Sequence, residues 1–169
     1  MFANRWLSVR EDAVRRPDGS TGHYTVVDSP DIALVIPSDG DRLHVVEQYR
    51  HAVAGRRWEF PSGSVDGNDA DAETCADREL REETGLSAGS LTLLGTLDAA
   101  PGTLRQRCSV FLATELTPGV PRRDAAEQDM RSAWFGVTDV ERMLRDGSIT
   151  DAKSAAAYAL LLVHQHVRH

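Results

Sequence analysis

Hydrophobic and polar residues alternate in short segments through the first third of the chain. This alternation, with a period of two residues, predicts β-strands. The segments expected to form strands are Trp6–Arg10, His23–Asp28, Ile32–Ile36 and Leu43–Glu47, followed later by Leu91–Leu97 and Cys108–Ala113. Turn residues separate the early segments at 17–19 (PDG) and 38–41 (SDGD), and 117–119 (TPG) is expected to be a loop.

The pattern changes to helical spacing after Asp71. Apolar side chains then recur on one face of a helix expected over Asp71–Thr84: Ala72, Cys75, Ala76 and Leu80. Asp71 is a favourable N-cap, and Gly85 stands where a helix usually ends in a left-handed residue. Two further helices are expected over Val137–Arg145 and Asp151–His166.

This order of strands and helices indicates an α/β domain with a mixed β-sheet between layers of helix. The length of 169 residues suits one compact domain, and 41% hydrophobic residues suffice for a core. We see no signal peptide at the start, and the longest apolar run, Ala155–Val163, is too short to span a membrane. We therefore expect a soluble, cytoplasmic protein that has no membrane partner.

The net charge of −7 makes nucleic acid an unfavourable partner, because binding its phosphates requires basic surfaces. An acidic protein that handles phosphates needs local cations, either from Lys and Arg side chains or from bound metal. The two cysteines, Cys75 and Cys108, lie far apart in sequence and are expected to be buried reduced thiols.

An acidic segment supplies the candidate chemistry. Glu79, Glu82 and Glu83 share one face of the expected helix, because residues three and four apart are neighbours there. Hard carboxylate oxygens at this spacing are ligands that Mg²⁺ or Mn²⁺ prefers. The alternative is a solvated charged face, neutralised by Arg78 and Arg81.

A loop before this helix favours the metal site. It runs from Trp58 to Gly67 (WEFPSGSVDG), and its Pro and Gly residues predict a tight turn that offers a backbone carbonyl. Loop and helix together resemble the Nudix box, G-x5-E-x7-R-E-U-x-E-E-x-G-U, in which U is a bulky aliphatic residue. The matching positions are Gly63, Arg78, Glu79, Leu80, Glu82, Glu83, Gly85 and Leu86.

The segment departs from the box in one respect. Arg78 follows Gly63 by 15 residues where the box has 14, so one residue is inserted between Ser64 and Ala70. The first Glu of the box is absent, and Asp69 or Ala70 stands near its place. In the family this Glu mainly braces the loop against the helix, so its absence concerns the loop geometry more than the chemistry.

Further segments extend the resemblance to the ADP-ribose pyrophosphatase branch: 17–19 (PDG), 45–52 (VVEQYRHA), 58–63 (WEFPSG) and 147–154 (GSITDAKS). This branch implies a Nudix α/β/α sandwich with a mixed sheet over 31–169, preceded by a small N-terminal β unit over 1–30. It also implies a homodimer in which the N-terminal unit swaps onto the second subunit and substrate binds between subunits. The expected reaction cleaves the diphosphate of a nucleoside-diphosphate sugar, above all ADP-ribose to AMP and ribose 5-phosphate.

The resemblance assigns roles to single residues. The carbonyl of Ser62 and the side chains of Glu79 and Glu83 would hold Mg²⁺, or Mn²⁺, with Glu82 assisting. Arg78 would brace the glutamates. A further residue, Arg50, would contact the diphosphate through its fork of donors.

Two aromatic residues are candidates for binding the base. Trp6 and Tyr24 stand where related enzymes stack aromatic side chains on adenine, and stacking suits any base because each has a π face. The alternative is that both are core residues of strands.

The loop over Ala99–Arg107 departs from the branch, which often has a catalytic Glu where this chain has Gln106. An amide orients water or substrate but does not accept its proton. The general base is then Glu82, Glu127 or Asp129, and the sequence does not choose among them. Two other functions stay open, hydrolysis of another nucleoside-diphosphate derivative and nucleotide binding without catalysis.

Overall fold

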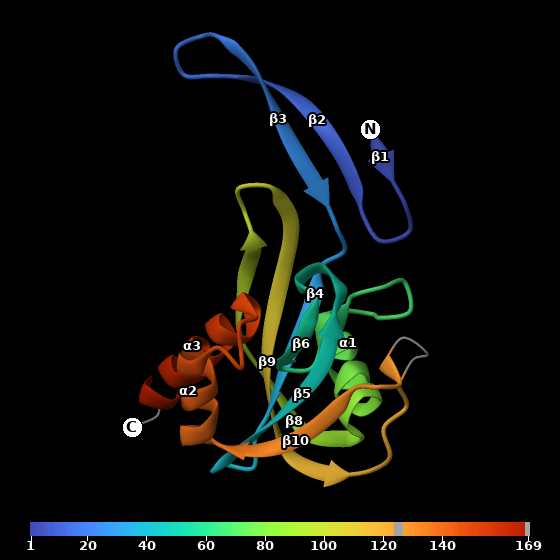
Figure 1. Cartoon of the computed structure of the whole chain (residues 1–169), viewed down its shortest axis with the longest axis vertical. Helices are drawn as coiled ribbons and strands as arrows, with labels where there is room; N and C mark the ends of the chain where they lie inside the picture. Colours follow the sequence, from blue (N-terminus) through green and yellow to red (C-terminus); the bar gives the residue numbers. More distant parts are fainter. Residues whose placement is uncertain (124–126, 168–169) are drawn as a thin grey trace.

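The computed structural model of the chain describes residues 1–123 and 127–167 (Figure 1). Its strands are β1 (Phe2–Ala3), β2 (Ser8–Arg15), β3 (Thr21–Asp28), β4 (Ile32–Pro37), β5 (Arg42–Arg50), β6 (Gly55–Glu59), β7 (Ser62–Ser64), β8 (Leu86–Ala100), β9 (Leu104–Pro118) and β10 (Arg131–Gly136). Its helices are α1 (Ala72–Glu79), α2 (Val137–Asp146) and α3 (Ala152–Val167), with a 3-10 turn η1 (His51–Val53) and a π-helical turn η2 (Leu80–Thr84). None of these helices is long and apolar enough to cross a membrane.

The strands of the described residues form two sheets. The larger has the order β1-β2-β3-β9-β4-β7, and β8 also pairs with β9. Strand β9 runs parallel to β3 and β4, whereas the other pairings in this sheet are antiparallel. The smaller sheet, β10-β5-β6, is antiparallel. The expected α/β class with a mixed sheet is confirmed.

Strand β4 is buried on both faces, and successive side chains along a strand point to opposite sides. One set packs with α2 and α3, in a core that includes Ile32, Leu34, Ile36, Val140 and Leu161. The other set packs with α1, in a core that includes Ala33, Val35, Cys75, Ala76 and Leu80. The sheet therefore lies between two layers of helix, as Figure 1 shows. Both cysteines are buried and free, as expected.

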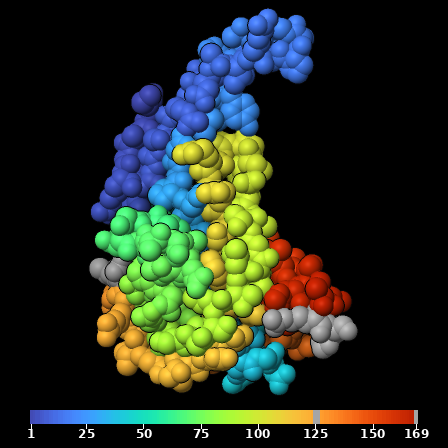
Figure 2. Space-filling model, turned by 180° about the vertical axis from the view of Figure 1, so that it is seen from behind, coloured from blue at the N-terminus to red at the C-terminus, as the bar shows by residue number. Residues whose placement is uncertain are grey.

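The N-terminal strands project from this body (Figures 1 and 2). Strand β3 pairs with β9 only at Val27↔Leu104 and Asp28↔Arg105, whereas the pairing of β4 with β9 begins at Ile32↔Cys108. Strand β9 thus spans the junction between the N-terminal strands and the rest of the chain.

The first expected strand is partly wrong. Trp6 lies in a bend, and the strand begins at Ser8 and continues to Arg15. The cause is Asn4, whose side-chain oxygen accepts hydrogen bonds from the backbone N–H groups of Trp6 and Leu7, at 2.8 and 3.0 Å. An Asn side chain that bonds its own following backbone offers the chain a turn in place of a sheet ladder.

The long hairpin of β8 and β9 also exceeds its expected length. The segments expected at 91–97 and 108–113 are only the middles of two 15-residue strands. Thr117 and Pro118, expected in a loop, are paired with Ser87 and Leu86 at the end of β9. A prediction from residue propensity ends these strands too early, because the hydrogen-bonded ladder continues through polar residues that have a low strand propensity.

The acidic helix begins and ends where its capping residues indicate. The side chain of Asp71 accepts the backbone N–H of Thr74 at 2.8 Å, and Gly85 ends the helix with φ of 76°. The expected α-helix is nevertheless wrong over its last five residues, which form η2. There the Thr84 hydroxyl donates to the carbonyl of Leu80. Single π-helical turns often occur at functional sites, and this one carries Glu82 and Glu83.

Candidate active site

The loop glycine of the expected box lies directly against the acidic helix. A Cβ atom on Gly63 would lie 1.8 Å from Oε1 of Glu79, so a larger residue would displace that carboxylate. Ser62 precedes it in β7 and pairs with Leu34 of the central strand β4. The sheet thereby holds the loop beside the helix, and Gly63 is required by this close approach.

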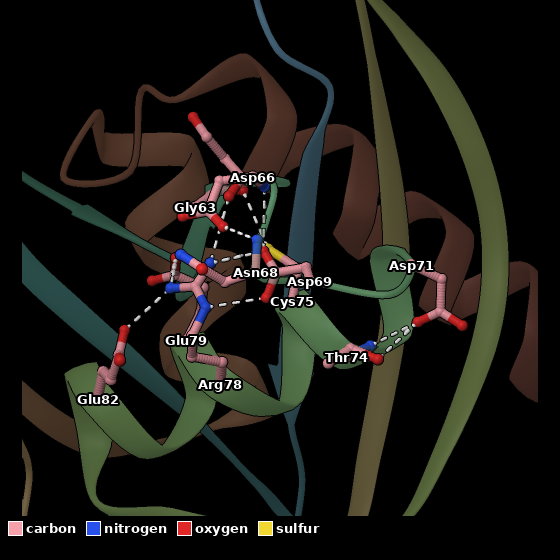
Figure 3. A network of polar contacts seen from close by, with 11 residues as sticks. Gly63, Asp66, Asn68, Asp69, Asp71, Thr74, Cys75, Arg78, Glu79 and Glu82 are labelled. Carbon is pink, nitrogen blue, oxygen red and sulfur yellow. Dashed lines mark hydrogen bonds and ion pairs between the residues drawn. The ribbon is translucent and has the colours of Figure 1, made fainter.

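Arg78 joins the loop to the helix (Figure 3). Its Nε and Nη2 atoms donate to the two carboxylate oxygens of Asp69 at 3.0 and 2.9 Å. Its Nη1 atom donates to Glu79 at 2.7 Å and to Glu82 at 3.0 Å. Nη2 also reaches the carbonyl of Ser64, at 3.3 Å. One guanidinium therefore contacts the loop and two of the three glutamates.

Asp69 takes the place of the missing box glutamate. Its side chain is 2% exposed, its carboxylate also accepts the backbone N–H of Asp66 at 3.1 Å, and the bond with Arg78 lowers its pKa. Asp69 therefore joins the loop to Arg78 although the first Glu of the box is absent and the loop is one residue longer.

Glu79 and Glu83 are buried, with 7% and 1% of their surface exposed. Burial raises the pKa of Glu79 to about 7 and raises the pKa of Glu83 well above its ordinary value. Oε2 of Glu83 has no hydrogen-bond partner among the described residues. Burying a hydrogen-bond acceptor without a partner costs free energy. The pair Glu79 and Glu83 therefore lacks a positively charged group that would complete the site.

The donor set fits a hard divalent cation, since carboxylate oxygens in a buried, electron-rich cluster are its preferred ligands. Among the described residues, no three acidic, His or Cys side chains are already gathered at metal-ligand spacing. Arg78 bonds both Glu79 and Glu82, but the side chain of Glu82 is 37% exposed, whereas Glu79 and Glu83 are buried. Glu79 and Glu83 are therefore the residues that would hold a cation directly.

Arg50, at the end of β5, lies beside this cluster. Its Nη2 atom is 2.7 Å from Oε1 of Glu59, which is buried. The pKa of Glu83 is raised mainly by burial and by the charges of Glu79 and Glu127. Smaller effects of Glu59, which raises it, and of Arg50, which lowers it, put both residues within electrostatic range. Glu59 was not among the residues expected from the sequence, although its place in the 58–63 segment is a signal that could have found it.

The three candidate bases have different surroundings. Asp129 pairs with Arg56 at 2.6 Å, and Glu82 pairs with Arg78. The charge of Glu127 contributes to the raised pKa values of both Glu79 and Glu83, so its carboxylate lies near the buried pair. Residues 125 and 126 of the same acidic loop lie outside the described residues.

Tyr24 and Gln106 line one cavity of about 580 Å³, between the N-terminal strands and the β8–β9 hairpin. The lining of this cavity includes none of the three glutamates. The Tyr24 hydroxyl donates to the carbonyl of Gly102, and the Gln106 amide donates to Ser29 and Pro30. Trp6 is outside this cavity and 61% exposed, with the guanidinium of Arg5 over its ring at 4.5 Å. The structure thus overturns the alternative that Trp6 is a core residue.

The N-cap of α3 connects this helix to the active-site loop. Asp151 accepts the backbone N–H and hydroxyl of Ser154 at 2.9 and 2.8 Å, and Ser154 accepts the backbone N–H of Phe60 at 3.0 Å. Burial alone would raise the pKa of Asp151, but Lys153 and these bonds outweigh it and lower the pKa. The segment at 147–154 therefore positions the start of the glycine loop.

A fold and site of this kind define a class of enzyme, and comparison with known proteins gives its name. The NUDIX domain model matches residues 28–158, and the model named nucleoside diphosphate sugar hydrolase N-terminal domain matches residues 1–27. The chain belongs to the Nudix family and is a Nudix hydrolase similar to ADP-ribose pyrophosphatases.

Two relatives and one solved structure illustrate the similarity. The ADP-ribose pyrophosphatase of Mycobacterium tuberculosis is 36% identical over 160 residues, covering 94% of this chain and 76% of that protein. The ADP-ribose pyrophosphatase of Bacillus subtilis is 26% identical, covering 95% of this chain and 88% of that protein. A crystal structure of an ADP compounds hydrolase superposes with a TM-score of 0.84 at 21% identity, covering 99% and 90% of the two chains. This last likeness concerns the fold.

Proposed function

We propose that this chain is a Mg²⁺-dependent hydrolase of nucleoside-diphosphate sugars and that ADP-ribose is its substrate. Water would add to one phosphorus of the diphosphate, the bridging P–O bond would break, and AMP and ribose 5-phosphate would leave. The observation that carries this proposal is the buried pair Glu79 and Glu83, with one unpartnered carboxylate oxygen and raised pKa values.

A divalent cation bound there would supply charge neutralisation for the phosphates and a more acidic water. Arg78 holds Glu79 in place, and the Gly63 backbone leaves room for its carboxylate. Arg50, beside the cluster, would donate to the diphosphate oxygens while Glu59 orients it. These residues bind and orient the reacting groups.

We assign Glu127 as the general base. Its charge raises the pKa of both Glu79 and Glu83, so its carboxylate lies within electrostatic range of the buried pair. A base must lie within reach of the attacking water, and it must be able to take up a proton near the operating pH. Glu127 would accept the proton of that water.

We also propose a homodimer, with the N-terminal unit of 1–30 acting on a partner and the hydrolase domain of 31–169 carrying the chemistry. Trp6 and Tyr24 are partly exposed, and the strands that flank them project from the body (Figure 2). Among the described residues, neither side chain forms a hydrogen bond with the glutamates of its own chain. A second copy would bring one chain's aromatic residues to the other chain's glutamates.

A substrate panel with Mg²⁺ tests the function. A phosphatase added to the reaction releases phosphate from AMP and ribose 5-phosphate but not from intact ADP-ribose. We expect phosphate release from ADP-ribose to exceed release from diphosphate sugars of other bases. Preference for another base would replace the adenine assignment, and no turnover with any member of the panel would overturn the proposal.

Variants separate the roles. Glu83→Gln should lower kcat by orders of magnitude, and Glu127→Gln by roughly 10²–10⁴-fold, the usual cost of losing a base. Asp129→Asn is the matched control for the base and should cost much less. If Asp129→Asn loses more activity than Glu127→Gln, the assignment of the base is wrong.

Sedimentation of the wild-type chain as a monomer at micromolar concentration would contradict the dimer.

A further inference from the structure

Three consecutive residues of β9 bind Asp28, the last residue of β3, and the linker of residues 29–31 that leads to β4. Arg105 Nε donates to Asp28 at 2.5 Å. Gln106 Nε2 donates to the Ser29 hydroxyl at 3.0 Å and to the Pro30 carbonyl at 2.7 Å. Arg107 donates to Asp31 through its backbone N–H at 2.8 Å and through its guanidinium at 2.9 Å.

The linker is the junction between two units. The two family models meet between residues 27 and 28, and the ladder between β3 and β9 stops at Asp28. The ladder between β4 and β9 begins at Ile32. Between the two ladders, hydrogen bonds from side chains of β9 connect the linker to the strand. These contacts join every residue from Asp28 to Asp31 to β9.

Gln106 is the central residue of this contact, and its amide group is what the contact requires. Both of its partners here accept a hydrogen bond, and an amide nitrogen carries two donors. An ionised glutamate is an acceptor only, so it would face the Pro30 carbonyl with no proton to share. Gln106 stands where the ADP-ribose pyrophosphatase branch often has a Glu, and its amide donors suit the hydrogen-bond acceptors of the linker.

We propose that Gln106 is a positioning residue for substrate binding, because it clamps the linker and so fixes the N-terminal unit that carries Tyr24. The same amide lines the 580 Å³ cavity together with Tyr24 and Arg10, so the clamp also sets the shape of that cavity. This inference rests on the proposed function for its kinetic consequence. Its structural consequence, a rigid junction, does not depend on that function.

The test uses two variants of the full chain that keep the length of the side chain but remove both donors, Gln106→Glu and Gln106→Met. We expect KM to rise about threefold to tenfold in both, with kcat within about twofold of wild type, because one or two hydrogen bonds are lost away from the chemistry. Ser29→Ala removes one acceptor only and should give a smaller rise. Gln165→Glu, the same change on the exposed face of α3, is the control and should change neither constant.

Hydrogen exchange supplies a readout that needs no substrate. The N–H of Val27 bonds to the carbonyl of Thr103 at 2.8 Å across the junction, and the N–H of Ala155 bonds to the carbonyl of Asp151 at the start of α3. We expect exchange at Val27 to become roughly threefold to tenfold faster in both Gln106 variants, with exchange at Ala155 unchanged.

The outcomes separate the clamp from the proposed function. Unchanged exchange at Val27 overturns the clamp. Faster exchange with an unchanged KM overturns the role in substrate binding, as does a loss of kcat at constant KM, which would place Gln106 in the chemistry. A higher kcat in Gln106→Glu than in Gln106→Met would also overturn it. If the wild-type chain hydrolyses no member of the panel, the proposed function fails while the exchange experiment still tests the clamp.

Discussion

The buried carboxylates make the stability of the metal-free protein depend on pH. Burial raises the pKa of Glu79 from 4.5 to about 7. Between these values the folded chain binds more protons than the unfolded chain, so its free energy of unfolding falls as pH rises. At 1.36 kcal/mol per pKa unit, Glu79 alone accounts for roughly 3 kcal/mol between about pH 4.5 and 7. Glu83, with its raised pKa, acts in the same direction.

Divalent cation should remove this dependence, because it binds the ionised carboxylates of the folded chain and stabilises that state. We expect Mg²⁺ to raise the unfolding midpoint more at pH 8 than at pH 5. The assay is denaturant unfolding at both pH values, with EDTA or with excess Mg²⁺.

Glu79→Gln should reduce the slope in EDTA and weaken the response to Mg²⁺, since an amide does not ionise. Glu73→Gln is the matched control, because Glu73 lies exposed on the same helix, and it should leave both unchanged. Two results would refute the reasoning: a metal-free stability that does not fall between pH 5 and 8, or equal stabilisation by Mg²⁺ at both pH values.

Three further changes have defined outcomes. Asp69→Ala leaves the partly buried guanidinium of Arg78 without its bidentate partner and should cost about 2–4 kcal/mol in urea unfolding; a loss under 1 kcal/mol would contradict the brace. Gly63→Ala places a methyl group against the Glu79 carboxylate and should lower kcat at least about tenfold while the circular dichroism spectrum stays native. Asp151, whose pKa is lowered, stabilises the fold above about pH 4 and loses this effect as pH falls further, so Asp151→Asn should flatten the acid side of the stability profile.

The limits of the acidic helix follow from local chemistry. Asp71 and Gly85 act on backbone groups within a few residues, so sequence alone places both ends. The bend at Trp6 is equally local, yet it was missed, because the Asn4 side chain competes with strand pairing and pattern analysis counts only the alternation. The π-helical winding of 80–84 is a small change in hydrogen bonding that periodicity over five residues does not register.

The sequence by itself indicated the family, six of the ten strands and the three α-helices of the described residues, and the spacing of Glu79, Glu82 and Glu83, since each of these depends on residues close together in the chain. Only the tertiary structure decided which side chains meet across turns and between strands. It paired Asp69 with Arg78 despite the inserted residue, Arg50 with Glu59, and Gln106 with a linker 76 residues away. Such contacts depend on how β4, β5 and β9 bring distant segments together, and a shift of one residue in a loop changes them without changing any local pattern.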